Sequence, residues 1–318
     1  MFTTKINSIE LHYCFKDDSH TMNALVFNKC EYEFLCIAKE ISQKLNVDIN
    51  IETEALGEGS LRSWFRFRSE DKNALRLGVI LYFITNFLGT PFTTTIDELT
   101  RMAIQSVFES EEVKQLKEEK KIAELKYDIT KIESEIVKLC SNIDENILKK
   151  RRSNYYETIN SCDKVNKIAI SITDNKNSNI YFQKEINKIE FESYIMTSDD
   201  IEPENDENAI IEIVSPVLKK GKYKWTGIYK GNIISFAMKS SEFKTLVQTG
   251  VVLFKNGTSI NSHLITNKKI NKDGEIYISG YEVVLVNQYF DNDKPIETPE
   301  GKRKRQNVEN EKMQLKLF

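Results

Sequence analysis

The stretch "YKWTGIYKGNIISFAMKSSEFKTLVQTG", residues 223–250, decides how the second half of the chain folds. Its first part alternates aromatic and β-branched residues with polar ones, and Gly231 interrupts the alternation. This pattern predicts two short strands separated by a turn. Residues 241–250 then space their apolar side chains as a helix does and end at Gly250, where glycine commonly terminates a helix.

Segments of the same kind surround this stretch, and they are separated by Gly, Asn and Asp. The tripeptides "KNG" (255–257) and "KDG" (272–274) are typical of hairpin turns. The acidic stretch "SDDIEPENDEN" (198–208) predicts a solvated loop. Many short strands at close spacing indicate a small β-barrel or sandwich over residues 166–290. Three of the predicted strands are "KIAISIT" (167–173), "AIIEIVSPVL" (209–218) and "SHLITNKKI" (262–270).

The pattern of residues 1–105 predicts a separate α+β domain. The alternation in "VDINIETEAL" (47–56) marks a half-buried strand, and "LRSWFRFR" (61–68) continues as another. Together with a strand at 4–15, these segments predict a small sheet. Two helices should back that sheet, one at 28–45 and a strongly apolar one at about 73–89.

A helical connector is predicted between the α+β domain and the barrel domain, at residues 106–165. Its apolar residues recur at alternating spacings of three and four, which is a heptad pattern. Either a second helix at 145–159 folds back on this seam as a hairpin, or the seam pairs with another chain and makes a homodimer through residues 122–143. The seam residues are Ile122, Leu125, Ile129, Ile132, Ile136, Leu139 and Ile143.

The fold class is therefore α+β, with an N-terminal small sheet, a central helical hairpin or coiled coil, and a C-terminal barrel or sandwich. Residues 291–318 are expected to be a flexible tail, because they contain two of the five prolines and lack apolar periodicity before Met313.

Catalytic motifs are missing from the sequence. The turn "GEGS" (57–60) lacks the GK[ST] of a phosphate loop, and there is no GxSxG. The five cysteines include no CxxC pair, so neither a metal site nor a cofactor is expected. The sequence favours a non-enzymatic protein, the alternative being an enzyme whose site is assembled from scattered residues.

The beginning of the chain has no apolar h-region, and free thiols suit a reducing compartment, so we expect a cytoplasmic protein. The segment "LGVILYFITNFLGTPF" (77–92) is as apolar as a membrane span but shorter than the ~20 residues that a bilayer requires. It predicts a buried core helix, and the alternative is a membrane segment of a membrane-linked defence component.

Two basic clusters are candidates for contact with DNA. In the first, Lys220, Lys222 and Lys224 alternate with aromatic residues that include Trp225. On a barrel strand, the lysines would face phosphates and the tryptophan would stack on bases. The same alternation also describes a strand whose aromatic face is buried. The second cluster would contact phosphates without reading sequence, and it consists of Lys302, Arg303, Lys304 and Arg305.

The segment "QLKLF", residues 314–318, is the most specific motif in the chain. It resembles the short peptide with which bacterial DNA polymerases, repair proteins and replication-initiation proteins bind the sliding clamp. That motif begins with Gln, continues with Leu and ends in a Leu-Phe pair. The resemblance implies that a groove on the clamp takes four side chains, those of Gln314, Leu315, Leu317 and Phe318.

The body of the chain also loosely resembles bacterial proteins encoded in mobile-element and phage-defence neighbourhoods, through its order of α+β domain, helical connector and β domain. Together the two resemblances imply an adaptor that is recruited to replicating DNA, with the sliding clamp as partner and DNA as a second candidate partner.

Overall fold

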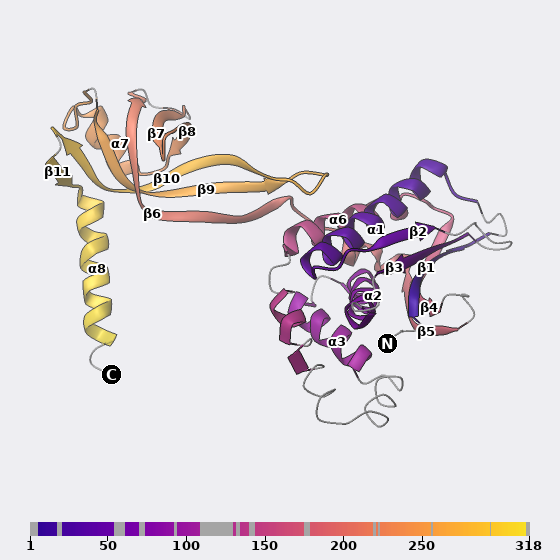
Figure 1. Cartoon of the computed structure of the whole chain (residues 1–318). Coiled ribbons are helices and arrows are strands. Elements are labelled where there is room, and N and C mark those ends of the chain that lie inside the picture. Colours follow the sequence, from indigo (N-terminus) through magenta and orange to yellow (C-terminus); the bar gives the residue numbers. More distant parts are fainter. Residues whose placement is uncertain are drawn as a thin grey trace. The chain divides into compact units, whose positions relative to one another are not determined.

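The computed structural model divides into two compact units (Figure 1). The N-terminal unit comprises Met1–Thr197 with Lys272–Gly274, and the barrel unit comprises Ser198–Asn271 with Glu275–Phe318. The structure describes residues 6–17, 21–53, 61–69, 74–91, 94–108, 130–131, 134–139, 144–174, 179–218, 221, 223–255, 257–292 and 294–315.

A five-stranded antiparallel sheet organises the N-terminal unit, in the order β2-β3-β1-β4-β5. The central strand β1 joins distant parts of the chain, because Ile9 lies opposite Phe65 on one side and Ile172 on the other. The strands are β1 (Ile6–Phe15), β2 (Asn50–Thr53), β3 (Arg62–Arg68), β4 (Val165–Asp174) and β5 (Ile180–Asn187).

Helices pack against one face of this sheet, where Ile9, Leu11 and Tyr13 of β1 share one apolar core with the helices. This confirms the predicted α+β arrangement of sheet and helices. The described helices are α1 (Ala24–Lys44), α2 (Ala74–Gly89), α3 (Ile96–Phe108), α6 (Glu145–Asn160) and the short 3₁₀ helix η2 (Lys188–Tyr194).

The helix α2 lies in this core, as its sequence predicts. Side chains on all sides of it, from Leu77 to Leu88, are buried, and the alternative of a membrane segment at 77–92 is not supported. Within the described parts of the chain, no helix combines the length and the apolar content that a bilayer crossing requires. Gly78 lets α3 approach, because a Cβ there would lie 3.2 Å from a methyl carbon of Val107.

The C-terminal end of α2 is buried, and side chains satisfy its last carbonyl groups. Arg152 of α6 donates hydrogen bonds to the carbonyl oxygens of Phe87 (2.8 Å) and Thr90 (2.7 Å). The hydroxyl of Tyr156 donates to the Leu88 carbonyl at 2.6 Å. These contacts explain why a polar helix such as α6 is buried next to the most apolar helix of the unit.

Two strands lie outside the domain to which the sequence assigned them. The predicted barrel domain 166–290 begins at β4, yet β4 and β5 extend the N-terminal sheet, and the units divide after Thr197. Alternation shows that Ile168, Ile170 and Ile172 face a core. It does not say which core, because any half-buried strand has the same period.

The predicted connector is only partly described. Within it, Ile136 is buried in the N-terminal core, and Glu135 forms an ion pair with Arg76 of α2 at 2.6 Å. The seam residues Ile122, Leu125, Ile129, Ile132 and Ile143 lie outside the described residues. The second helix of the connector, α6, packs on α1 through hydrogen bonds from Arg151 and Asn154 to Glu33, both of 3.2 Å. The homodimer through 122–143 stays a prediction.

The barrel unit contains a closed five-stranded barrel, which confirms the predicted small barrel. Its order is β6-β7-β8-β10-β9, and β9 pairs with β6 to close it. The only parallel pairing among the described strands joins β8 to β10, where Phe236 lies opposite Tyr281. The strands are β6 (Asp200–Ser215), β7 (Trp225–Tyr229), β8 (Asn232–Met238), β9 (Ser259–Ile270) and β10 (Ile276–Asp291), and α7 (Ser241–Gln248) follows β8.

A tight turn at Lys230 and Gly231 connects β7 to β8. Both residues have positive φ angles, of 49° and 80°, which match the twist of a two-residue hairpin. The glycine predicted as a break between two strands therefore has a conformational reason, since Gly adopts positive φ without steric cost.

The acidic stretch 198–208 was predicted to be a solvated loop, but from Asp200 onward it forms the first half of β6. Its carboxylates lie opposite the lysines of β9. Asp200 pairs with Lys269 at 3.2 Å, and Glu204 forms an ion pair with Lys268. Cross-strand charge pairs make a charged segment compatible with a strand.

The segment predicted as a flexible tail also differs from the prediction. It contains β11 (Lys294–Glu297), which pairs with β10, and the helix α8 (Pro299–Leu315). Proline at the first helical position suits a helix start, and the hydroxyl of Thr298 caps it by accepting from the Gly301 amide at 3.0 Å. Local capping thus provides the order that apolar periodicity does not predict.

Candidate partner-binding surfaces

The first basic cluster does not expose its tryptophan. Trp225 has only 1% of its surface exposed, and it packs in the barrel core with ring centroids 6.2 Å from Phe243 and 5.6 Å from Phe254. A base cannot stack on a ring that solvent does not reach, so the interpretation of Trp225 as a nucleic-acid contact is replaced by the core interpretation. Lys224 is exposed, as is Tyr223 at 65%. Lys220 and Lys222 lie outside the described residues.

The second basic cluster lies on α8, where three of its four cations have carboxylate partners. Arg303 pairs with Glu242, and Lys304 pairs with Glu207 at 2.9 Å. Arg305 contacts Glu297 at 2.9 Å, and this hydrogen-bonded pair lowers the pKa of the glutamate. These partners cancel much of the positive field that a phosphate would meet, while Lys302 is exposed.

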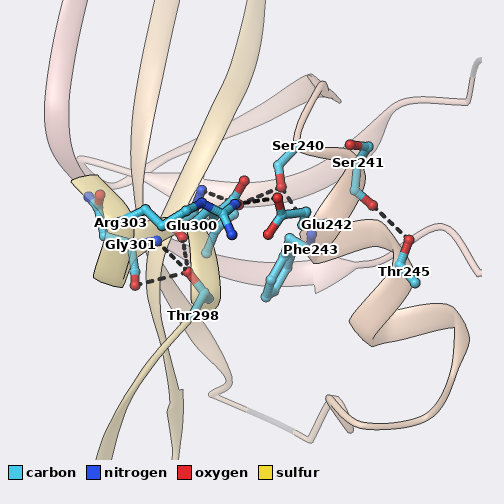
Figure 2. A network of polar contacts seen from close by, with 11 residues as sticks. Ser240, Ser241, Glu242, Phe243, Thr245, Thr298, Glu300, Gly301 and Arg303 are labelled. Atoms are coloured by element: carbon cyan, nitrogen blue, oxygen red, sulfur yellow. Dashed lines mark hydrogen bonds and ion pairs between the residues drawn. The ribbon is translucent and has the colours of Figure 1, made fainter. Parts of the chain in front are cut away.

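The first turn of α8, called its root below, begins at Pro299 and is attached to the barrel by a polar network (Figure 2). Ser240, which caps α7, donates to the Glu300 carboxylate at 2.5 Å, and the same oxygen accepts from the Val286 amide at 2.9 Å. Gly301 touches β10 so closely that a Cβ would overlap the backbone of Asn287. The first turn of α8 is therefore held on two sides.

Beyond its root, α8 is exposed. Its side chains from Arg303 to Lys312 are exposed apart from the half-buried Lys304, and the helix runs away from the barrel (Figure 1). Gln314 and Leu315 are its last residues. Leu317 and Phe318 lie outside the described residues, so the structure places the beginning of the motif at the end of an exposed helix.

An apolar groove, which the sequence did not reveal as a site, lies on the barrel between the end of β6 and the segment 251–255. Its volume is about 820 Å³, within the range of ligand sites. Ile213, Val247 and Val252 form a buried floor. Val214, Leu218 and Leu253 form a rim that is 55%, 65% and 68% exposed.

A signal for this groove exists in the sequence. In "AIIEIV" (209–214), apolar residues occupy both faces of the strand, with Ile211 and Ile213 inside and Ile210 and Val214 outside. A strand that packs on a core with one face and meets solvent with the other needs apolar residues on only one face. Of the additional apolar residues, Ile210 is 50% and Val214 is 55% exposed, and Val214 lines the groove.

The N-terminal unit brings a histidine and a cysteine together on β1, with His12 Nε2 3.9 Å from Cys14 Sγ. Burial, followed by the nearby charges of Arg62 and Lys167, lowers the pKa of His12 to about 4. Its imidazole is therefore neutral at pH 7. In the part of the chain that the structure describes, no group of three His, Cys, Asp or Glu side chains could hold a metal ion.

Comparisons with protein-family models, with curated proteins and with solved structures find no match to this chain. The class that the geometry defines is an α+β protein with a closed five-stranded barrel carrying a polar helix.

Proposed function

We propose that the protein is a non-enzymatic, cytoplasmic adaptor of DNA replication, recruited to the bacterial sliding clamp through residues 314–318. The match of Gln314, Leu315, Leu317 and Phe318 to all four defining positions of the clamp-binding peptide carries this proposal. By the loose resemblance of its body to bacterial proteins from phage-defence and mobile-element neighbourhoods, the adaptor acts in phage defence or serves a mobile element.

The form of α8 supports this role. The helix is fixed at its root by Glu300 and Gly301. Its exposed side chains from Arg303 to Lys312 are polar apart from Val308, so this part of the helix has no apolar face with which to fold onto the barrel. It would hold the motif about 25 Å from its root, at a rise of 1.5 Å per residue. A preformed groove on a ring could then take the two leucines and the phenylalanine as anchors.

A single short peptide of this kind should bind in the roughly micromolar range, because ordering it costs conformational entropy. A ring with several identical grooves would strengthen the attachment by avidity if the protein is dimeric. The homodimer predicted through residues 122–143 would supply that second tail.

The test measures binding of the full chain to an immobilised bacterial sliding clamp. The double variant Leu317→Ala/Phe318→Ala should lower the affinity at least about a hundredfold, because both anchors are lost. Lys316→Ala is the matched control, since the middle position tolerates substitution, and it should bind as wild type does. Unchanged binding by the double variant, with an unchanged melting temperature, would disprove the proposal.

A second candidate function is contact between the barrel and single-stranded DNA. The strand order, the parallel pairing of β8 with β10 and the position of α7 between β8 and β9 are those of the OB-fold, a class that often binds oligonucleotides. Exposed Tyr223 offers the stacking surface that Trp225 lacks, and Lys224 lies beside it.

Fluorescence anisotropy with a labelled oligothymidine tests this second function. Tyr223→Ala should weaken binding about tenfold or more, as the loss of one stacked base would. Tyr277→Ala, which changes a tyrosine that is 50% exposed on β10, is the control. Equal affinities for the two variants would exclude Tyr223 as a stacking platform.

A further inference from the structure

The apolar groove on the barrel combines a volume of about 820 Å³ with a buried apolar floor and an exposed apolar rim. Three of its rim residues, Val214, Leu218 and Leu253, are each more than half exposed and lie around a buried apolar floor. Monomeric proteins seldom leave such a surface uncovered, because apolar groups in contact with water cost free energy. The exposed apolar rim over a buried apolar floor would suit a partner with apolar side chains.

The groove lies beside backbone that is held in place. The Ile213 amide donates to the Thr258 carbonyl at 2.9 Å, and the amides of Val251 and Val252 both donate to the Leu246 carbonyl. The ring of Phe254 packs on Trp225. Because these contacts fix both walls, the groove is preformed, which lowers the entropy cost of binding a short peptide.

Two charged residues line the groove, and they differ in their partners. Lys255 forms an ion pair with Asp291 at 3.3 Å. Glu212 is exposed, and none of the ion pairs among the described residues involves it. The groove therefore favours an apolar segment that carries a single positive charge.

This chain contains such a segment, in which Leu315, Leu317 and Phe318 surround Lys316. We propose that the groove of one molecule binds residues 314–318 of a second copy, with the apolar side chains on the groove floor and Lys316 beside Glu212. The tail would thus have a docking site on the protein itself, independent of the sliding clamp.

The geometry of α8 favours a second copy over the same chain. The helix leaves the barrel from a fixed root (Figure 1). Because it has 17 residues at a rise of 1.5 Å each, its last residue, Leu315, lies about 25 Å from its first. The three residues that follow span at most about 11 Å when extended. They are too short to return along the helix to the barrel from which it started.

A labelled peptide of residues 310–318, added to the full chain carrying Leu317→Ala/Phe318→Ala, tests the proposal by fluorescence anisotropy. This receptor has an intact groove and a disabled tail of its own. We expect a dissociation constant of roughly ten micromolar. Adding Val214→Glu to the receptor should weaken binding at least about tenfold, and Leu253→Glu should do the same; both side chains are exposed, so the added carboxylate reaches solvent.

The matched control is Ile278→Glu, which changes an apolar residue that is 50% exposed on β10 and outside the groove lining. It should leave the affinity unchanged. Absence of binding, equal binding of a peptide with scrambled sequence, or equal binding by the Val214→Glu and Leu253→Glu receptors would overturn the proposal. The assay contains no clamp, so its outcome and that of the clamp experiment are independent.

Sedimentation velocity gives the second readout. Full chains with Val214→Glu alone, or with Leu317→Ala/Phe318→Ala alone, should associate more weakly than wild type. A mixture of the two should recover association, because one variant supplies the tail and the other the groove. If the mixture stays monomeric while wild type associates, the tail does not dock in the groove.

Discussion

Replacing Arg152 with methionine tests how the buried end of α2 is stabilised. Arg152 is 1% exposed. Its guanidinium donates to the carbonyls of Phe87 and Thr90 and lies 4.4 Å from the ring centroid of Phe87. Methionine fills similar apolar volume, so the substitution mainly removes the two hydrogen bonds. Each carbonyl left without a donor costs about 1–3 kcal/mol, so the N-terminal unit should lose about 2–6 kcal/mol of its free energy of unfolding.

Urea denaturation measures this loss. A Trp225→Phe background leaves Trp64 of β3 as the single tryptophan, so fluorescence follows the N-terminal unit alone. The control is Lys149→Ala on the same helix, which breaks a surface pair with Glu145 and should cost under about 1 kcal/mol. A loss below about 1 kcal/mol for Arg152→Met would show that water or a backbone shift satisfies the carbonyls, and it would refute the reasoning.

Three further predictions concern the barrel unit. Trp225→Ala should cost about 3–5 kcal/mol of stability, as a large cavity in the core does, and a calorimetric scan of the barrel transition would measure it; a cost below about 1 kcal/mol would contradict its place in the core. Gly301→Ala should destabilise the barrel unit by about 1–3 kcal/mol, because the added methyl group meets the Asn287 backbone. It should also reduce the helical circular dichroism signal. An unchanged spectrum and stability would argue against the tight contact. The hydrogen bond from the Tyr229 hydroxyl lowers the pKa of Asp206. Its contribution to stability is therefore complete above the ordinary Asp pKa and is lost as pH falls below about 4. Asp206→Asn should make the melting temperature depend less on pH between pH 5 and 3, and an equally steep dependence would contradict this assignment.

Local patterns predicted most elements of the N-terminal unit. The alternation in residues 61–68 predicted β3, and the continuous apolar run at 73–89 predicted α2 as a core helix. These predictions succeeded because the period of burial is set by the backbone itself, two residues in a strand and 3.6 in a helix.

Candidate sites were harder to predict. Trp225 had two interpretations, since alternation shows that it lies opposite the lysines but does not show which face is covered. The packing of Phe243 and Phe254 on its ring decides that it belongs to the core. The apolar groove combines residues from β6 with residues from the segment 251–255, which lie more than thirty positions apart, so the second apolar face of residues 209–214 could signal only one of its walls.

The sequence alone determined the QLKLF motif and those strands and helices that show a clear apolar period, because these depend on the order of neighbouring residues. It did not determine β11, α8 or the acidic half of β6, which lack such a period. Tertiary structure decided which sheet each strand joins. The strand β4 pairs with β1 although more than 140 residues separate them, while β6 accepts its acidic half because the lysines of β9 lie opposite. Which strands pair with one another depends on long-range contacts and on the charges of facing strands, and these interactions form only when segments distant in the sequence come together.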